Sequence, residues 1–130
     1  LRWIMKNLKK KNLFKQFTKN IEPVKHIINP IEMESAKAAR LYKDKSLDFI
    51  MIDGAHDGDN VYQDLKAWMP KLKKTGVMAG DDFQEKGVRE GIKRYANEEG
   101  DFGMAFSSNV CPAWIRVDKT MKGKWGTPLL

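Results

Sequence analysis

The side chains with the most reactive chemistry follow two apolar stretches of the sequence. Asp53 and His56 come at the end of "LDFIMID", whereas Asp81 and Asp82 come at the end of "GVMAGDD". If both stretches are parallel strands, their carboxyl ends meet at one edge of a sheet, where the ligands of open α/β sheets bind. Neighbouring strands lie ~4.8 Å apart, so we expect Asp53, Asp81 and Asp82 to converge.

Converging carboxylates need compensation, because like charges repel and burial disfavours the charged form. A bound cation supplies it, and so do hydrogen-bond donors from glycine-bearing loops. Carboxylate oxygens are the ligands that Mg²⁺ and Mn²⁺ prefer. We therefore predict a divalent-cation site at Asp53, Asp81 and Asp82. His56, three residues past Asp53, can act there as a base, a ligand or a hydrogen-bond donor.

Helix capping is the alternative for the acidic residues. Short acidic side chains commonly cap the first turn of a helix. For Asp57 and Asp59 we favour capping, with Asp59 or Asn60 placed to cap a helix that starts at residue 60. One member of the Asp81–Asp82 pair could cap the next helix in the same way.

The elements that position these side chains alternate between helix and strand. The stretch 46–53 is apolar without alternation, which indicates burial on both faces and hence a parallel sheet. The whole order predicts a doubly wound α/β fold, whose last two strands are antiparallel because their connection is too short for a crossover. We predict helices over 1–17, 33–42, 60–74 and 86–100, and strands over 23–29, 46–53, 77–79 and within "GMAFSSN" and "AWIRVD".

Composition bounds the class of protein. The chain has 130 residues, of which 42% are hydrophobic and 32% charged, as in one ordinary globular domain. No apolar run approaches the ~20 residues that span a bilayer, so we expect no membrane partner. The single cysteine and the missing secretory signal predict an intracellular, cytoplasmic protein.

The net charge of +7 comes from the first 20 residues, which carry seven basic side chains and no acid. Apolar residues interleave with the lysines, so this basic segment is interpreted as a helix with a solvated face. A surface for an acidic partner is the alternative, and we expect no nucleic acid. The tail 119–130 is predicted to be loosely held.

A family resemblance rests on "SLDFIMIDGAHDGDNVYQDLKAWMPKLKKTGVMAGDDF" followed by "GVREGIKRYA". These stretches resemble the C-terminal half of class I S-adenosylmethionine-dependent methyltransferases. The similar subgroup reads D-G-x-H, a D-L-x-x-W helix, G-G-x-x-x-G-D-D and a G-V helix. The resemblance covers roughly 33–118. It implies a partial Rossmann-like sheet, with parallel strands, an antiparallel last strand and helices on both faces.

The resemblance also implies a reaction and its residues. The donor would be S-adenosylmethionine, and the acceptor a hydroxyl of a small molecule. Asp53 and His56 match positions next to the chemistry. Asp53, Asp81 and Asp82 match the ligands of a divalent cation that holds the hydroxyl. Glu34 and Ser35 match residues that approach the adenine.

Two parts of the family pattern do not occur in the sequence: the G-x-G-x-G loop and the acidic residue for the cofactor ribose. The loop would precede the first predicted helix and the acid would end the family's second strand, so we expect a partial domain that binds S-adenosylmethionine weakly or not at all. A non-catalytic α/β binding domain or a degenerate methyltransferase fragment remains the alternative. Without a first strand beside it, "LDFIMI" would be a sheet edge or would pair with "VKHII" instead. An exposed apolar edge predicts a homodimer or larger assembly.

Overall fold

The computed structural model describes residues 10–99, 103–106 and 113–117. The chain divides into two compact units, residues 1–34 and residues 35–130, which we describe separately. The predicted tail 119–130 lies outside the described residues, as does the first part of the predicted helix 1–17. The expectation of a single domain stays a prediction.

The first unit contains helix α2, Lys10–Asn20, and a short 3₁₀ helix, Glu22–Val24. The strand predicted over 23–29 is wrong. Pro23 lacks an N–H and suits the first turn of a helix, and the backbone then bonds to itself, with the Ile27 N–H on the Val24 carbonyl at 3.0 Å. The apolar side chains that suggested a strand are largely exposed in this unit, Ile27 by 75%.

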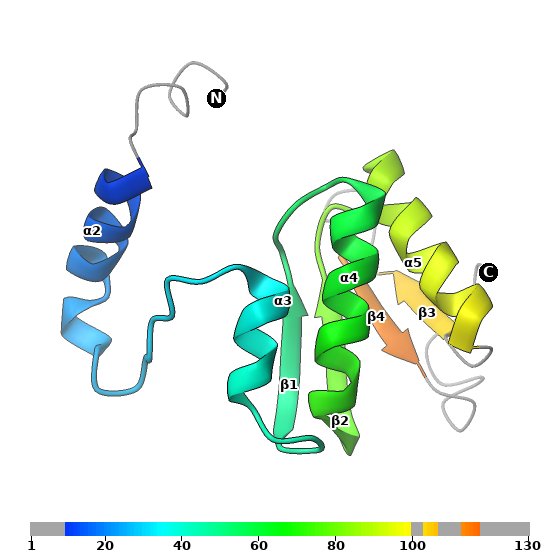
Figure 1. The fold of residues 1–130 in the computed structure, drawn as a ribbon, viewed down its shortest axis with the longest axis horizontal. Coiled ribbons are helices and arrows are strands. Elements are labelled where there is room, and N and C mark those ends of the chain that lie inside the picture. The colour runs from blue at the N-terminus through cyan, green and yellow to red at the C-terminus, as the bar shows by residue number, and fades with distance from the viewer. Residues whose placement is uncertain (1–9, 100–102, 107–112, 118–130) are drawn as a thin grey trace. The chain divides into compact units, whose positions relative to one another are not determined.

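The second unit is built on a mixed four-stranded sheet in the order β1-β2-β4-β3 (Figure 1). The parallel pair β1 and β2 places Ile52 beside Gly80. Strand β4 runs antiparallel to both of its neighbours. This confirms the predicted α/β class, a partial Rossmann-like sheet with a reversed last strand. The strands are β1 Leu47–Ile52, β2 Leu72–Gly80, β3 Gly103–Phe106 and β4 Trp114–Val117.

The helix between β1 and β2 is shorter than predicted, and strand β2 is longer than predicted. The helix predicted over 60–74 starts two residues earlier and ends at Trp68, because Pro70 cannot supply the next backbone hydrogen bond. Strand β2 then begins at Leu72 rather than at residue 77. The helical segments of this unit are α3 Ser35–Ala38, η2 Ala39–Leu41, α4 Gly58–Trp68, η3 Met69–Lys71 and α5 Lys86–Glu99.

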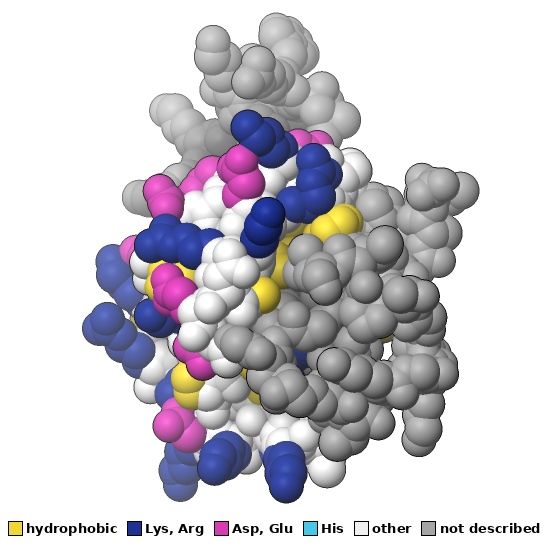
Figure 2. Space-filling view, turned by 90° about the vertical axis from the view of Figure 1, so that its right-hand side faces the viewer, with side chains coloured by type: hydrophobic (Ala, Val, Ile, Leu, Met, Phe, Trp, Pro, Cys, Tyr) yellow, Lys and Arg dark blue, Asp and Glu magenta, His cyan; other side chains and the backbone are white. Residues whose placement is uncertain are grey.

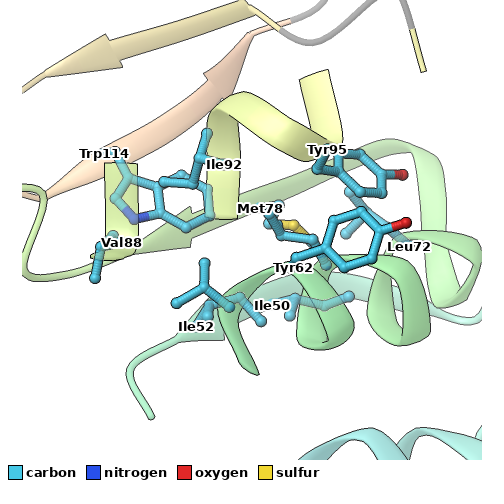
Figure 3. Packing of buried hydrophobic residues seen from close by; sticks show 11 residues of the cluster. Ile50, Ile52, Tyr62, Leu72, Met78, Val88, Ile92, Tyr95 and Trp114 are labelled. Carbon is cyan, nitrogen blue, oxygen red and sulfur yellow. The ribbon is translucent and has the colours of Figure 1, made fainter. Parts of the chain in front are cut away.

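One face of the sheet carries the core. Figure 1 shows α4 and α5 side by side over the strands, and Figure 3 shows Ile50, Ile52 and Met78 pointing from the sheet into that layer. Trp114 of β4 is fully buried there. Its indole passes over Gly80, where any side chain would overlap the ring.

Among the described residues, the other face of the sheet carries exposed apolar side chains. Phe49, Met51, Val77 and Ile115 share that face by register, and all four are exposed, Phe49 by 59%. Helical cover on this second face stays a prediction.

The outer surface of the described residues mixes charges of both signs. In the view of Figure 2, Lys and Arg side chains are interspersed with Asp and Glu. No helix in the described part of the chain is long and apolar enough to cross a membrane.

Candidate active site

The predicted site residues leave the sheet at neighbouring positions. Strand β1 ends at Ile52, and the Asp81 N–H donates to the Ile52 carbonyl at 3.2 Å, so the two strands remain paired up to the residues of interest. Beyond them lies a pocket of about 10 Å³, roughly the space of one water molecule. Its polar lining comes from Asp53, His56, Asp81 and Asp82. The structure therefore brings the four predicted side chains to one place.

His56 and Asp82 form a direct contact within this pocket. His56 Nε2 lies 2.8 Å from Asp82 Oδ2, with side-chain exposures of 52% and 28%. The second carboxylate oxygen, Oδ1, accepts a hydrogen bond from Gln84 Nε2 at 3.0 Å. A carboxylate held at both oxygens can fix the orientation of an imidazole, as the acid does in acid–base dyads.

Asp82 adopts an unusual backbone conformation. Its φ of 57° lies in the left-handed region, which costs about 1 kcal/mol for a residue with a side chain. Hydrogen bonds hold it there: the Asp82 N–H donates to Asp81 Oδ1 at 2.8 Å, and its carbonyl accepts from the Glu85 N–H at 2.8 Å. Such a conformation, maintained by its surroundings, is typical of functional positions.

The predicted metal site has no support in this geometry. In the described part of the chain, no group of three or more His, Cys, Asp or Glu side chains could hold a metal ion. Asp82 is engaged by His56 and Gln84, and Asp81 by a backbone N–H. Hydrogen-bond donors therefore contact the carboxylates of Asp81 and Asp82 in this structure. The side chains as they lie do not fit a divalent cation, and the metal roles of Asp53, Asp81 and Asp82 stay predictions.

Asp57 caps helix α4. Its Oδ1 accepts from the Asn60 N–H at 3.0 Å and its Oδ2 from Asn60 Nδ2 at 2.8 Å. Both hydrogen bonds lower the pKa of Asp57, and the bond from the Asn60 side chain has the larger effect. The capping interpretation is confirmed for Asp57, but the expectation that Asp59 or Asn60 is the cap is wrong because the helix starts at Gly58. Asp59 instead accepts a hydrogen bond from Arg94.

A larger groove of about 460 Å³ runs along β1, within the size range of small-molecule sites. Ser35 lies in this groove, and its hydroxyl accepts a hydrogen bond from Trp68 Nε1 at 3.0 Å. The Trp68 ring in turn lies 5.5 Å from the ring of Tyr42. Ile52, Asp53 and Gly54 line both the groove and the small pocket, so the two spaces meet at the end of β1. Glu34 belongs to the first unit, and its cofactor role stays a prediction.

Asp64 is a site residue that the sequence analysis missed. It is a buried carboxylate, only 8% exposed, and it lines the groove. Its carboxylate lies beside Gly54, where a Cβ would be in ordinary van der Waals contact with Asp64 Oδ2 at 3.7 Å. A signal exists: Asp64 follows Val61 by three residues and precedes Trp68 by four, which places an acid on the buried stripe of α4.

A family model described as a methyltransferase domain matches residues 4–83. This range is more than half of the chain. The chain belongs to the methyltransferase-domain family. No curated protein matches it.

The matched range of the methyltransferase domain ends one residue after Asp82. It therefore includes every predicted site residue from Glu34 to Asp82, together with β1 and α4. Helix α5 and the strands β3 and β4 follow it in sequence.

Proposed function

We propose that this methyltransferase domain transfers a methyl group from S-adenosylmethionine to a hydroxyl of a small molecule, with His56 as the base. The observation that carries the proposal is the 2.8 Å contact between His56 Nε2 and Asp82 Oδ2. It lies beyond the strand ends of a chain that belongs to a methyltransferase family, at the edge where open α/β sheets bind ligands.

The groove along β1 is the proposed donor site. Its volume of about 460 Å³ suits a ligand of nucleoside size, and its lining combines flat apolar side chains with Ser35 and Asp53. When bound, S-adenosylmethionine supplies a methyl group on a cationic sulfur. Asp53 sets a carboxylate where the groove meets the small pocket, and this negative charge favours a cationic group there.

His56 is proposed to take the proton of the acceptor hydroxyl. Because Asp82 holds Nε2, Nδ1 is the nitrogen that can accept this proton. The Asp82 carboxylate then stabilises the imidazolium that forms, as in other acid–base pairs. General-base catalysis of this kind contributes roughly 10²–10⁴-fold to a rate. No step is assigned to a metal ion.

The test is methyl transfer from isotope-labelled S-adenosylmethionine at millimolar concentration, since donor binding is expected to be weak, with a panel of hydroxylated aromatic and aliphatic acceptors. We expect His56→Gln to lower kcat about 10²–10⁴-fold with little change in the KM for the donor. Asp82→Asn should lower kcat less. Asp59→Asn removes an acid from the first turn of α4 outside the pocket and is the matched control.

Two results would contradict the proposal. One is transfer by His56→Gln at the wild-type rate. The other is donor binding without transfer to any acceptor, which would favour the non-catalytic domain. The same assay in the presence of EDTA tests the metal role, because loss of activity there would restore Asp53, Asp81 and Asp82 as ligands.

A further inference from the structure

We propose that Gly87, in the first turn of α5, is a positioning residue that holds His56 against Asp82. The chemical meaning of this role rests on the proposed function. The structural role itself rests on two sets of contacts, one on each side of the His56–Asp82 pair, that both lead to the same helical turn.

The first set joins α5 to the backbone of His56. A Cβ at Gly87 would overlap the carbonyl oxygen of His56, and it would lie 3.0 Å from Asp57 Cα and 3.1 Å from the nitrogen of Gly58. All three atoms belong to the backbone, so no side-chain rotation could make room. The loop that carries His56 therefore lies directly on the backbone of α5.

Gly91 extends this close approach by one helical turn. It lies on the same face of α5 as Gly87, four residues later. A Cβ there would lie 2.7 Å from both the Gly58 carbonyl oxygen and Val61 Cβ. The Gly87–Gly91 pair thus lets the first turns of α4 and α5 meet backbone to backbone, two residues after His56.

The second set joins the same turn to Asp82. The Glu85 N–H donates to the Asp82 carbonyl at 2.8 Å, and the Arg89 N–H donates to the Glu85 carbonyl at 3.2 Å. Arg89 Nη1 also donates to the carbonyls of Phe83, at 2.9 Å, and Gln84. The loop after β2 is therefore bonded to the start of α5.

Both partners of the pair are thus positioned by one helical turn. If a methyl group at residue 87 pushed His56 away from Asp82 by about 1 Å, the 2.8 Å separation would leave the range of a hydrogen bond. Gly87 then sets the contact without touching it.

The test is ¹H–¹³C NMR of the full 130-residue chain with labelled histidine rings. The chain has two histidines, so His26 serves as an internal reference. The His56 signal in Asp82→Asn defines an imidazole without its carboxylate partner. We expect Gly87→Ala to displace the His56 signal in the same direction, by at least half as much.

Gly76→Ala is the matched control. It adds the same methyl group to a crowded position in β2, 2.7 Å from Leu72 Cδ1 and 3.0 Å from the Asp48 carbonyl, near the start of β1. We expect it to leave the His56 signal in place. A wild-type His56 signal in Gly87→Ala, or an equal displacement in Gly76→Ala, would overturn the proposal.

If Gly87→Ala does not fold, Arg89→Ala tests the same turn from the Asp82 side. Arg89 is exposed, and its loss should displace the His56 signal in the same direction by a smaller amount. An unmoved signal would then overturn the proposal. These measurements need no methyl transfer, so an inactive but correctly positioned His56 would contradict the proposed function alone.

Discussion

The two faces of the β1–β2 pair differ sharply in solvent exposure, although both carry apolar side chains. On one face Ile50, Ile52 and Met78 are at most 9% exposed, whereas Phe49 and Met51, the alternate residues of β1, are 59% and 47% exposed. Both faces are apolar, which is why the stretch reads as a strand buried on both sides. The difference arises from α4 and α5, which pack on one face only, and it shows where the described unit still offers apolar surface.

The candidate site lies between the side of the sheet that α4 and α5 cover and the groove along β1. On the covered side, the first turns of α4 and α5 hold His56 and Asp82 in contact. Along β1, which is an edge strand of the sheet formed by the described residues, the groove opens. Asp53 lines both spaces. The contact between His56 and Asp82 thus borders an accessible groove.

The largest expected effect compares a core residue of the covered side with a residue of the open face. Leu65 is fully buried, so Leu65→Ala should lower the free energy of unfolding by about 2–5 kcal/mol. Phe49→Ala removes a larger side chain that is mostly exposed in the single chain. At a concentration low enough to keep the chain monomeric, it should lower the free energy of unfolding by less than about 1 kcal/mol. Urea denaturation of both variants measures the contrast. Equal losses would show that the open face is covered in solution.

The open face also carries the proposal of a homodimer or larger assembly. Phe49, Met51, Val77 and Ile115 share one exposed apolar surface, and burial against a second copy would remove it from water. Phe49 and Met51 also line the groove, so we expect assembly and donor binding to compete for these two side chains. We expect the 15.0 kDa chain to sediment as a dimer or larger at micromolar concentration, and Phe49→Lys to sediment as a monomer. Glu90→Lys on α5 is the control for added charge. A wild-type monomer at every concentration would contradict the assembly.

How far the sequence predicts this fold depends on how local the signal is. Strand β1 and helix α5 were predicted within one residue at each end because apolar runs, periodicity and glycine punctuation are local. The prediction of a strand over 23–29 was wrong because an apolar run does not indicate whether a partner strand is available to pair with it. Strand β2 was predicted too short because the polar residues at its start resemble a helix end.

The sequence indicated which residues lie at the candidate site but not which of them contact one another. Strand ends indicated Asp53, His56, Asp81 and Asp82, and the structure brings them together. The contact between His56 and Asp82 depends on the left-handed backbone conformation of Asp82. The close packing of the His56 backbone on Gly87 depends on how closely α4 and α5 approach each other. Such features follow from tertiary packing, which spacing along the chain does not encode.

The smallest expected effect concerns the outer contact between the two covering helices. Tyr62 on α4 donates to Glu98 Oε2 on α5 at 2.6 Å, and Lys66 Nζ donates to the Tyr62 hydroxyl at 3.1 Å. The hydrogen bond from Tyr62, and then the charges of Lys66 and Arg94, lower the pKa of Glu98. A carboxyl whose pKa is lower in the folded than in the unfolded state stabilises the fold above its unfolded pKa, and this contribution disappears as the pH falls through the folded pKa.

Glu98→Gln removes this titration while keeping an oxygen that can accept from Tyr62. We therefore expect the wild type to be more stable than Glu98→Gln at pH 6, and the difference in urea midpoint to shrink as the pH falls through the folded pKa of Glu98 and its carboxyl loses its charge. Glu99→Gln removes the same charge from the next position of α5 and is the control. A wild-type advantage that stays constant from pH 6 to pH 3 would show that the Glu98 carboxylate does not help α5 to cover the sheet.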